Sequence, residues 1–380
     1  MKLLCLDQTA ELGGAELSLF AEVTNLRHDI SVLLFEDGPF REMLEAANVK
    51  VEVLQAPAGA MTVRREAGIA AILFALPAVV KLVLTVAARA KAYDIIYANS
   101  QKAFVIGVFA SALARRPLVW RLRDVLSASH FSATLRRTAV FLANWKARRV
   151  IPNSVATGKA FVSVGGKADR VSVAYPGIDE GPFARISAEE IAAIRAEIGG
   201  GDAPLIGVFS RLSQWKGQGV FIDAIAKLPD AIGVIVGGPL FGHEAFAAEL
   251  TEKVAAMGLQ NRIRFLGFRR DIPLLMTAMD VIVHSSIAPE PFGRVVVEGM
   301  LAGKPMVASA AGGVLEIIEH EKTGWLYEPG NPEALAGALG SVFADKARSA
   351  AIAHAGQIHA RDTFTVAATV KQIETALREC

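Results

Sequence analysis

The sequence predicts an α/β protein with two doubly wound halves, and three observations lead to this fold class. Short apolar runs alternate with helical patterns along the 380 residues. The runs are continuously apolar, which is typical of parallel strands buried on both faces. The alternation stops near residues 175–185, where a Tyr-Pro-Gly-Ile-Asp run and a Gly-Pro pair indicate a linker, and then restarts.

The first half is expected to hold a parallel sheet with helices between its strands. Helical patterns lie at 15–26, 66–92, 102–114 and 154–164, with basic helical patterns up to residue 146. Helices that separate strands form parallel crossover connections, so this order predicts a doubly wound sheet. The expected strands are 2–7, 30–35, 50–55, 94–99, 117–122, 148–153 and 170–175.

The second half repeats this architecture and ends in a helical tail over residues 332–380. We therefore expect a first domain over 1–178 and a second over 179–360, which agrees with two or three domains for a chain of this length. Ligands usually bind in clefts at domain interfaces. The expected strands are 205–210, 232–237, 262–267, 280–285, 305–309 and 324–328.

Composition excludes several classes of protein. Hydrophobic residues make up 52% and charged residues 21%, so the chain can form a core and is not disordered. The two cysteines, Cys5 and Cys380, cannot build a disulfide framework or a Cys-rich metal site. This usage fits a reducing cytosol, and the first residues have too short an apolar run for a signal peptide. A cytoplasmic protein is expected.

The net charge of +2 conceals a basic block at residues 60–150. This block holds 15 Lys and Arg against three acidic residues, a net charge of +12. Such a block favours an anionic partner, either a lipid surface, a nucleic acid or a phosphorylated substrate, over a merely solvated face. Its cations alternate with aliphatic rather than aromatic residues, so no base-stacking surface for nucleic acid is expected.

Residues 69–88 form an apolar stretch long enough to consider as a membrane span. Pro77 and Lys81 lie near its middle, and basic residues flank both ends, which argues against spanning. Two interpretations stay open: a helix that lies in the membrane interface and a helix that is buried in the core.

The loop Ser210–Gly217 follows a predicted strand and carries two cations, Arg211 and Lys216. Arg offers a planar fork for bidentate contact with phosphate, and Lys offers a point charge. The loop leads into a helix whose N-terminus also favours an anion. The pattern indicates a diphosphate site, with two solvated loop cations as the alternative.

A pair of carboxylates, Glu290 and Glu298, lies in a loop and in the helix that follows it. Carboxylates accept hydrogen bonds from hydroxyl groups, which suits a sugar and a ribose. The backbone N–H groups of Phe292, Gly293 and Arg294 would open this helix and point at an anion. Taken alone, two glutamates at this spacing can also be a coincidence.

Three glycine pairs follow predicted strands, at 13–14, 237–238 and 312–313. Paired glycines let the backbone approach a ligand closely, although each pair alone is equally typical of a tight turn. The first pair lacks the G-x-G-x-x-G spacing, so the sequence does not support a dinucleotide fingerprint.

Together these motifs resemble glycosyltransferase family four, the retaining nucleotide-sugar glycosyltransferases of the GT-B fold. The resemblance covers nearly the whole chain and is strongest over residues 205–340. It implies two Rossmann-like domains that face each other across a cleft, with a C-terminal helix, 361–380, that packs back on the first. The motifs are GGAE (13–16), SRLSQWKG (210–217), VGGP (236–239), FLGF (265–268), EPFGRVVVEGMLAGKPMVAS (290–309) and TGWLYEPGNPEALAGAL (323–339).

The resemblance also implies roles for individual residues. Arg211 and Lys216 match the pair that holds the donor diphosphate and stabilises the leaving group. Glu290 matches the acid that contacts the transferred sugar, and Glu298 matches the acid that holds the ribose. The other donor-binding positions implied are Gly13, Gly14, Ser210, Gly238, Phe268, Arg269, Phe292, Gly293 and Arg294.

The chain departs from the family pattern after the strand at 117–122. Relatives often place a His near position 121, close to the reacting centre, whereas this chain has Arg121, followed by Arg123 and Asp124. An arginine stays charged and cannot act as a base. It can stabilise a phosphate or an anionic acceptor, and Arg123 with Asp124 is the alternative functional pair.

The implied activity is retaining transfer of a sugar from a nucleotide diphosphate, UDP more than GDP, to a hydroxyl of a glycan or lipid-linked acceptor. Such transfer belongs to polysaccharide or lipopolysaccharide biosynthesis. The departing phosphate oxygen would take the acceptor's proton in a front-face reaction. No cofactor and no metal are expected, because the sequence has no D-x-D motif that we assign to a metal-bound diphosphate.

Two other functions fit the same fold: a sugar-nucleotide isomerase or epimerase, and a non-catalytic nucleotide-sugar binding protein. The basic, apolar first domain favours an acceptor at an anionic surface instead. We therefore expect a peripheral protein at the inner face of the plasma membrane, without a nucleic-acid partner.

Overall fold

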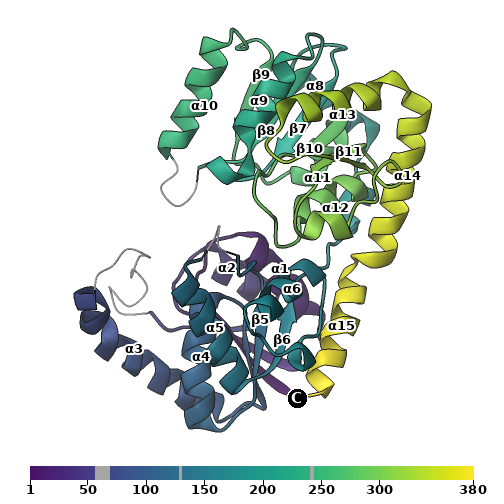
Figure 1. Ribbon diagram of the computed structural model, residues 1–380. Coiled ribbons are helices and arrows are strands. Elements are labelled where there is room, and N and C mark those ends of the chain that lie inside the picture. Colours follow the sequence, from purple (N-terminus) through teal and green to yellow (C-terminus); the bar gives the residue numbers. More distant parts are fainter. Residues whose placement is uncertain (56–68, 128–130, 240–243) are drawn as a thin grey trace. The chain divides into compact units, whose positions relative to one another are not determined.

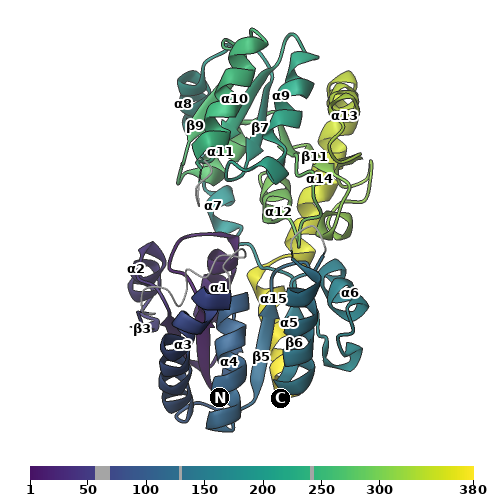
Figure 2. The same cartoon turned by 60° about the vertical axis from the view of Figure 1, so that its left-hand side comes forward.

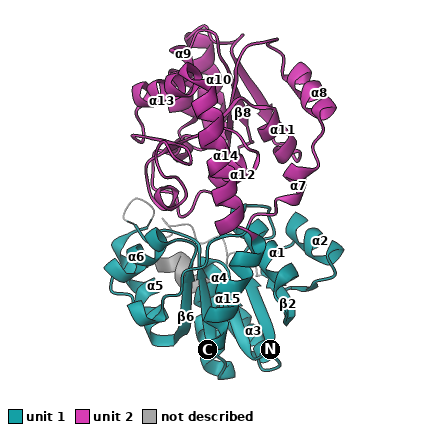
Figure 3. Ribbon diagram, turned by 90° about the vertical axis from the view of Figure 1, so that its right-hand side faces the viewer, with its two compact units in different colours: residues 1–177, 366–380 teal, residues 178–365 magenta. Residues whose placement is uncertain are grey.

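The computed structural model describes residues 1–55, 69–127, 131–239 and 244–380, except for the side chains of residues 69–75 (Figure 1). The chain forms two compact units (Figure 3). Unit 1 consists of residues 1–177 and 366–380, and unit 2 consists of residues 178–365. Both units are α/β.

Unit 1 is built on a parallel six-stranded sheet with the order β3-β2-β1-β4-β5-β6. Helices α3, α4 and α5 pack on one face of this sheet, and α1, α2 and α15 pack on the other. The strands are β1 (Lys2–Asp7), β2 (Asp29–Leu34), β3 (Lys50–Val53), β4 (Ile95–Ala98), β5 (Leu118–Leu122) and β6 (Ala147–Pro152). The helices are α1 (Gly14–Asn25), α2 (Pro39–Ala46), α3 (Ile69–Ala90), α4 (Gln101–Ala114), α5 (Ala133–Lys146), α6 (Val155–Ser163) and α15 (Val366–Arg378).

The prediction of a seventh strand at 170–175 is wrong. Only Val171 forms a β-bridge, with Val150 of β6, and a 3₁₀ turn (Ala168–Arg170) precedes it. The Ser172 and Ala174 N–H groups still donate to the Val150 and Pro152 carbonyl oxygens of β6, at 3.0 and 3.1 Å, but no strand forms, and Tyr175 bonds to α15. The Tyr175 N–H donates to the Gln372 side chain at 2.9 Å, and the Thr369 hydroxyl donates to the Tyr175 carbonyl oxygen at 2.7 Å.

Unit 2 contains the six strands predicted for the second half, in the order β12-β11-β10-β7-β8-β9. All of the pairings between these strands are parallel. The strands are β7 (Leu205–Phe209), β8 (Ile232–Val236), β9 (Ile263–Gly267), β10 (Val281–His284), β11 (Met306–Ser309) and β12 (Trp325–Tyr327). The helices are α7 (Gly181–Ala184), α8 (Ala188–Ile198), α9 (Gln218–Ala226), α10 (Glu244–Ala256), α11 (Ile272–Ala278), α12 (Arg294–Leu301), α13 (Pro332–Ala344) and α14 (Lys346–Thr363).

In each sheet the strand order reverses at one point, between β1 and β4 in unit 1 and between β7 and β10 in unit 2. The loops that leave two such strands run in opposite directions, so a crevice opens beyond their carboxyl ends. The residues that follow β1, β4, β7 and β10 are therefore expected to line a ligand site.

The expected helix at 66–92 corresponds to α3, and residues 66–68 lie outside the described part of the chain. Its C-terminal half buries Leu82, Val86 and Ala90 and packs against α4. Leu76, Val80 and Leu84 follow at four-residue spacing on the opposite side and are exposed. The described residues contain no helix that is long and apolar enough to cross a membrane.

The chain returns to unit 1 through α15, which lies against α1 and β6 (Figure 2). The return begins at residue 366 and not at 361, because α14 runs to Thr363 and residues up to 365 belong to unit 2. Ile373, Ala376 and Leu377 are buried in the same cluster as residues of β1 and α1. The last helix is therefore part of the core of unit 1.

We expect Ile373→Ala to lower the free energy of unfolding of unit 1 by about 2–5 kcal/mol, the usual range for a buried Ile that leaves a cavity. The exposed Lys371→Ala on the same helix is the control and should stay within about 0.5 kcal/mol of wild type. Urea denaturation measures both. Equal stability of the two variants would contradict a core role for α15.

Candidate active site

The centre of the site in unit 2 is built on the loop after β7. A 3₁₀ turn (Gln214–Lys216) ends at Gly217, which has a φ of +70°. A Cβ on Gly217 would lie 1.9 Å from the carbonyl oxygen of Ser285, so only glycine lets this loop approach the segment after β10. The Ser285 hydroxyl also donates to the Lys216 carbonyl oxygen at 2.7 Å. These contacts fix the start of the Lys216 side chain.

Glu290 is fixed from the opposite side by the glycine pair at 312–313. The Gly313 N–H donates to the Glu290 carbonyl oxygen at 2.9 Å. A Cβ on Gly312 would lie 2.2 Å from that same oxygen, so this close backbone pairing requires glycine. The third glycine pair thus holds a carboxylate in position.

Lys216 and Glu290 form an ion pair, with Nζ of the lysine on Oε1 of the glutamate. The Ser286 hydroxyl donates to the same Oε1 at 2.6 Å, and Nε2 of His284 lies 3.2 Å from it. A carboxylate only accepts, so the His284 proton belongs on Nε2, and its Nδ1 accepts from the Ser309 hydroxyl at 3.1 Å. Within the described part of the chain these contacts all end on Oε1, so Oε2 can accept from a ligand.

The charge of Glu290 depends on these partners. Burial alone would raise the pKa of its carboxyl, but the charge of Lys216 and the hydrogen bond with His284 hold that pKa well below the usual range. Glu290 is therefore ionised at any physiological pH. It can orient a ligand hydroxyl, but it cannot donate a proton.

The two loop cations share one aromatic ring. The Lys216 Nζ lies 4.2 Å from the ring centroid of Trp215, and the Arg211 Cζ lies 5.7 Å from it. The Gln218 amide holds the loop by donating to the Ser210 hydroxyl at 2.8 Å and to the Arg211 carbonyl oxygen at 2.9 Å. Arg211 and Lys216 therefore lie around the same ring, where both can serve a diphosphate site.

The predicted carboxylate Glu298 lies on α12, which begins at Arg294 after Gly293. Arg294 and Glu298 pair at 3.2 Å, one turn apart. Gly293 has a φ of +108°, and Phe292 is buried with its ring 5.4 Å from that of Phe364. The start of α12 is thus fixed beside the Glu290 loop.

Three further predicted donor residues lie at the carboxyl ends of β8 and β9. The Leu212 N–H donates to the Gly238 carbonyl oxygen at 3.0 Å, which ties this loop to the one that carries Arg211. Phe268 is 66% exposed and free to stack on a ligand. Arg269 is held by Asp271, at 2.6 and 2.8 Å, and by Glu197 at 2.5 Å. A role for Arg269 at the base stays a prediction.

In unit 1, the predicted arginines Arg121 and Arg123 converge on Glu22 of α1. Nε of Arg121 lies 3.0 Å from the Glu22 carboxylate, and Nη2 of Arg123 lies 3.1 Å from both of its oxygens. The Tyr97 hydroxyl donates to the same carboxylate at 2.9 Å. Glu22 is buried, which would raise its pKa, but the two guanidinium groups lower the pKa below its ordinary value.

This network gives Arg121 a structural position. Its side chain is completely buried and also donates to the carbonyl oxygens of Ile151 and Pro152. A buried guanidinium with a carboxylate partner is costly to separate from it. A contact of Arg121 with a phosphate or an acceptor stays a prediction. Arg123 pairs with Glu22, and Asp124 is exposed.

The first glycine pair lies close to a second buried carboxylate, Glu16. A Cβ on Gly13 would lie 2.7 Å from Oε2 of Glu16, in the first turn of α1. Burial, and secondarily the nearby Asp7, raises the pKa of Glu16 to about 7. Asp7 ends β1 and accepts from the Asn99 amide at 2.5 Å. The crevice between β1 and β4 therefore holds a carboxyl group that titrates near neutral pH.

The sequence prediction did not include several residues of these sites. In unit 2 they are His284, Ser286 and Ser309. His284 and Ser309 end two adjacent predicted strands, so the rule that ligands lie at the carboxyl ends of parallel strands could have identified them. In unit 1 the omitted residues are Glu16, Glu22, Tyr97 and Asn99, and Glu22 gave no local signal because its partners are about 100 residues away.

The raised pKa of Glu16 leads to a pH-dependent prediction. Between pH 4.5 and about 7 the folded state holds a proton that the unfolded state has lost, so this group makes stability fall as the pH rises. Glu16→Gln removes this loss. Its stability relative to wild type should be similar at pH 4 and higher by roughly 1–3 kcal/mol at pH 8.

Thermal unfolding at a series of pH values measures this difference. The exposed Glu11→Gln is the matched control and should follow the wild-type pH profile. A constant difference between Glu16→Gln and wild type across the pH range would show that Glu16 has an ordinary pKa.

Comparison with known proteins agrees with this architecture. A model of glycosyl transferases group 1 matches residues 191–359, and a glycosyl transferase 4-like domain matches residues 16–177. The chain is 43% identical, over the full length of both chains, to Anabaena Alr3699/HepE in a structure with UDP and glucose, with a TM-score of 0.90.

Curated relatives are more distant. A D-inositol 3-phosphate glycosyltransferase from Salinispora tropica is 32% identical over 54% of this chain and 45% of its own length. The lipopolysaccharide core biosynthesis mannosyltransferase LpsB from Rhizobium meliloti is 28% identical over 68% of each chain. The chain thus spans about half the length of the first of these relatives and two thirds of the second. On the two family models and the full-length match, the chain belongs to the group 1, family-four-like glycosyltransferases of the GT-B fold.

Proposed function

We propose that this protein transfers a sugar from UDP-glucose or a closely related UDP-sugar to a hydroxyl group of a glycan or lipid-linked acceptor. One observation carries the proposal: Lys216 and Glu290 form a buried ion pair beside the exposed Arg211 at the switch point of unit 2. The full-length relative that was solved with UDP and with UDP-glucose supports the choice of base and sugar.

In the proposed reaction, the diphosphate leaves with its charge stabilised by Lys216, Arg211 and the N–H groups that open α12. Glu290 accepts a hydrogen bond from a sugar hydroxyl through Oε2 and so orients the sugar. The acceptor hydroxyl attacks from the face that the diphosphate leaves. Its proton passes to the departing phosphate oxygen, so no residue of the protein acts as a base.

We propose that this transfer retains the anomeric configuration and needs no metal ion. Retention follows from attack on the leaving-group face. Arg211 and Lys216 would compensate the negative charge of the departing diphosphate. In other enzymes that release a phosphate or diphosphate group, a bound divalent metal ion provides this charge.

We further propose that the acceptor lies at an anionic membrane surface, to which unit 1 binds peripherally. The basic block at 60–150 and the exposed apolar side of α3 support this location, although Arg64 and Arg65 of the block lie outside the described residues. The lipopolysaccharide relative supports an acceptor of glycan or lipid-linked type.

Lys216→Ala should weaken UDP binding by roughly 10- to 100-fold, because a hydrogen bond to a charged group contributes about 1.5–3 kcal/mol. Calorimetry in the presence of EDTA measures this effect and tests metal independence at once. Lys227→Ala is the matched control, an exposed lysine of the same unit that should leave binding unchanged.

Because Lys216→Ala leaves Glu290 without its cation, its folding should be checked by thermal unfolding. Arg211→Ala is the second variant, and its exposed side chain makes misfolding no concern. Wild-type binding of UDP that appears only when Mg²⁺ is added would refute the metal-free proposal.

Glu290→Gln should lower kcat about 10²- to 10³-fold while the Kd for UDP stays within roughly threefold, because the charge acts on the sugar and not on the nucleotide. Proton NMR of the product made by wild type should show the anomeric configuration of the donor. An inverted product would refute retention. Conversion of the UDP-sugar to an isomer without any acceptor would contradict the transferase proposal itself.

A further inference from the structure

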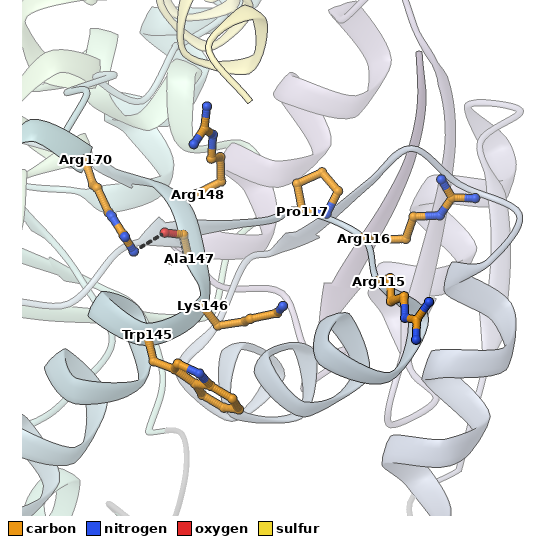
Figure 4. A pocket seen from close by; sticks show the side chains of 8 residues that line it. All are labelled: Arg115, Arg116, Pro117, Trp145, Lys146, Ala147, Arg148 and Arg170. Carbon is orange, nitrogen blue, oxygen red and sulfur yellow. Dashed lines mark hydrogen bonds between the residues drawn. The ribbon is translucent and has the colours of Figure 1, made fainter.

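Unit 1 has a pocket of about 370 Å³ that is separate from both sets of site residues (Figure 4). Five of its eight lining residues are cations, and none is acidic. The cations are Arg115, Arg116, Lys146, Arg148 and Arg170. A pocket of this volume is large enough for a phosphate headgroup.

The pocket lies at the amino ends of strands in the unit 1 sheet, whereas Arg121 and Arg123 lie toward their carboxyl ends. Its lining residues Pro117 and Ala147 are at the amino ends of β5 and β6, whereas Arg123 follows the carboxyl end of β5. The two ends of β5, a strand of five residues, are roughly 15 Å apart. The pocket therefore cannot be part of the crevice between β1 and β4.

Two of the five cations have structural partners. Nη1 of Arg170 donates to the carbonyl oxygens of Ala143, Asn144 and Ala147 at 2.8–3.2 Å, which caps the end of α5, and Figure 4 shows its contact with Ala147. Nη2 of Arg116 donates to the Lys91 carbonyl oxygen at 2.7 Å. Helix capping explains these two arginines without any ligand.

The other three cations, Arg115, Lys146 and Arg148, form no ion pair or side-chain hydrogen bond within the described part of the chain. A nearby carboxylate, Glu379, pairs with Arg149 instead, at 2.7 Å. Three cations that line one pocket and form no ion pair repel one another, so an anion in the pocket would stabilise them.

The surface beside the pocket is apolar and aromatic. Trp145 lines the pocket and is 53% exposed, and its ring centroid lies 6.4 Å from that of Phe109. Phe141 and Leu113 lie one helical turn from these two residues, and both are more than half exposed. We call Phe109, Leu113, Phe141 and Trp145 the apolar rim.

We propose that the basic pocket binds the phosphate of an acidic phospholipid headgroup while the apolar rim enters the membrane interface. Amphipathic aromatic side chains beside uncompensated Lys and Arg match the charge and polarity of that interface. This inference rests on the proposed membrane location of the acceptor and assigns the residues that provide it.

Vesicle co-sedimentation tests the proposal with the full-length protein. Wild type should bind phosphatidylcholine vesicles that contain roughly one third phosphatidylglycerol, and binding should weaken at high salt. The triple variant Arg115→Ala, Lys146→Ala, Arg148→Ala should bind about 100-fold more weakly, at roughly fivefold for each cation near the surface.

The matched control removes three exposed cations from other positions of unit 1, as Arg27→Ala, Lys159→Ala and Lys371→Ala. It carries the same net charge as the pocket variant and should lose less than about fivefold. Equal losses in the two triple variants would mean that only the total charge of unit 1 matters, which would overturn the proposal.

Tryptophan fluorescence tests the apolar rim. Of the four tryptophans, Trp120 and Trp325 are buried and Trp215 belongs to the site in unit 2, so a blue shift on adding vesicles should come from Trp145. Trp145→Phe should abolish the shift while keeping most of the binding. A blue shift that persists in Trp145→Phe would overturn the membrane contact of this surface.

Soluble glycerol 1-phosphate separates a lipid from a free phosphate compound as the source of the anion. Binding of this compound to the pocket, in a protein that does not bind vesicles, would overturn the lipid assignment. Calorimetry with UDP keeps the two proposals apart, because the pocket variant should bind UDP as wild type does. If wild type did not bind UDP, the proposed function would be refuted, and the vesicle result would still be valid.

Discussion

The ion pair between Lys216 and Glu290 is the interaction on which the site in unit 2 depends. A carboxylate buried as deeply as Glu290 would take up a proton or destabilise the fold unless a cation and hydrogen-bond donors compensate its charge. Here a lysine from the loop after β7, a histidine at the end of β10 and a serine two residues further all reach one oxygen. Both glycine contacts follow from this requirement, because Gly217 and Gly312 let the two loops approach closely enough for the side chains to meet.

Unit 1 also contains a buried carboxylate whose charge is compensated by cations. Its buried acid, Glu22, comes from a helix, and its cations, Arg121 and Arg123, come from β5 and the residue just after it. Removal of one member would leave a buried charge without compensation, so this network fixes α1 against the centre of the sheet. Gly13 at the N-cap of α1 and Glu16 in its first turn thereby lie in the crevice between β1 and β4. Arg121 is thereby tied to the scaffold, and the pKa of Glu16 in this crevice is raised to about 7 by burial.

The sequence predicted those features that depend on local pattern. Buried parallel strands have continuous apolar runs, so all six strands of unit 2 were predicted correctly. Residues 170–175 have the same pattern but make a single β-bridge with β6, and the chain then turns to α15 at Tyr175. The pairing of Lys216 with Glu290 joins two motifs that sequence reasoning had found separately, 74 residues apart. Glu22 could not be found in this way, because a glutamate on an amphipathic helix is ordinarily exposed. Only the fold brings it to arginines about 100 residues later.

The same comparison changes the interpretation of the basic block at 60–150. A charge count within a sequence window ignores acids from outside it, and here such acids neutralise several of the cations. Glu22 pairs with Arg121 and Arg123, Glu52 pairs with Arg89, and Glu379 pairs with Arg149. The uncompensated charge is therefore smaller than the window suggests and more localised. Part of it gathers at Arg115, Lys146 and Arg148, beside the exposed ring of Trp145. A uniformly basic domain would attract any polyanion, whereas a small basic pocket with an apolar rim is selective for a surface that presents phosphate and hydrocarbon together.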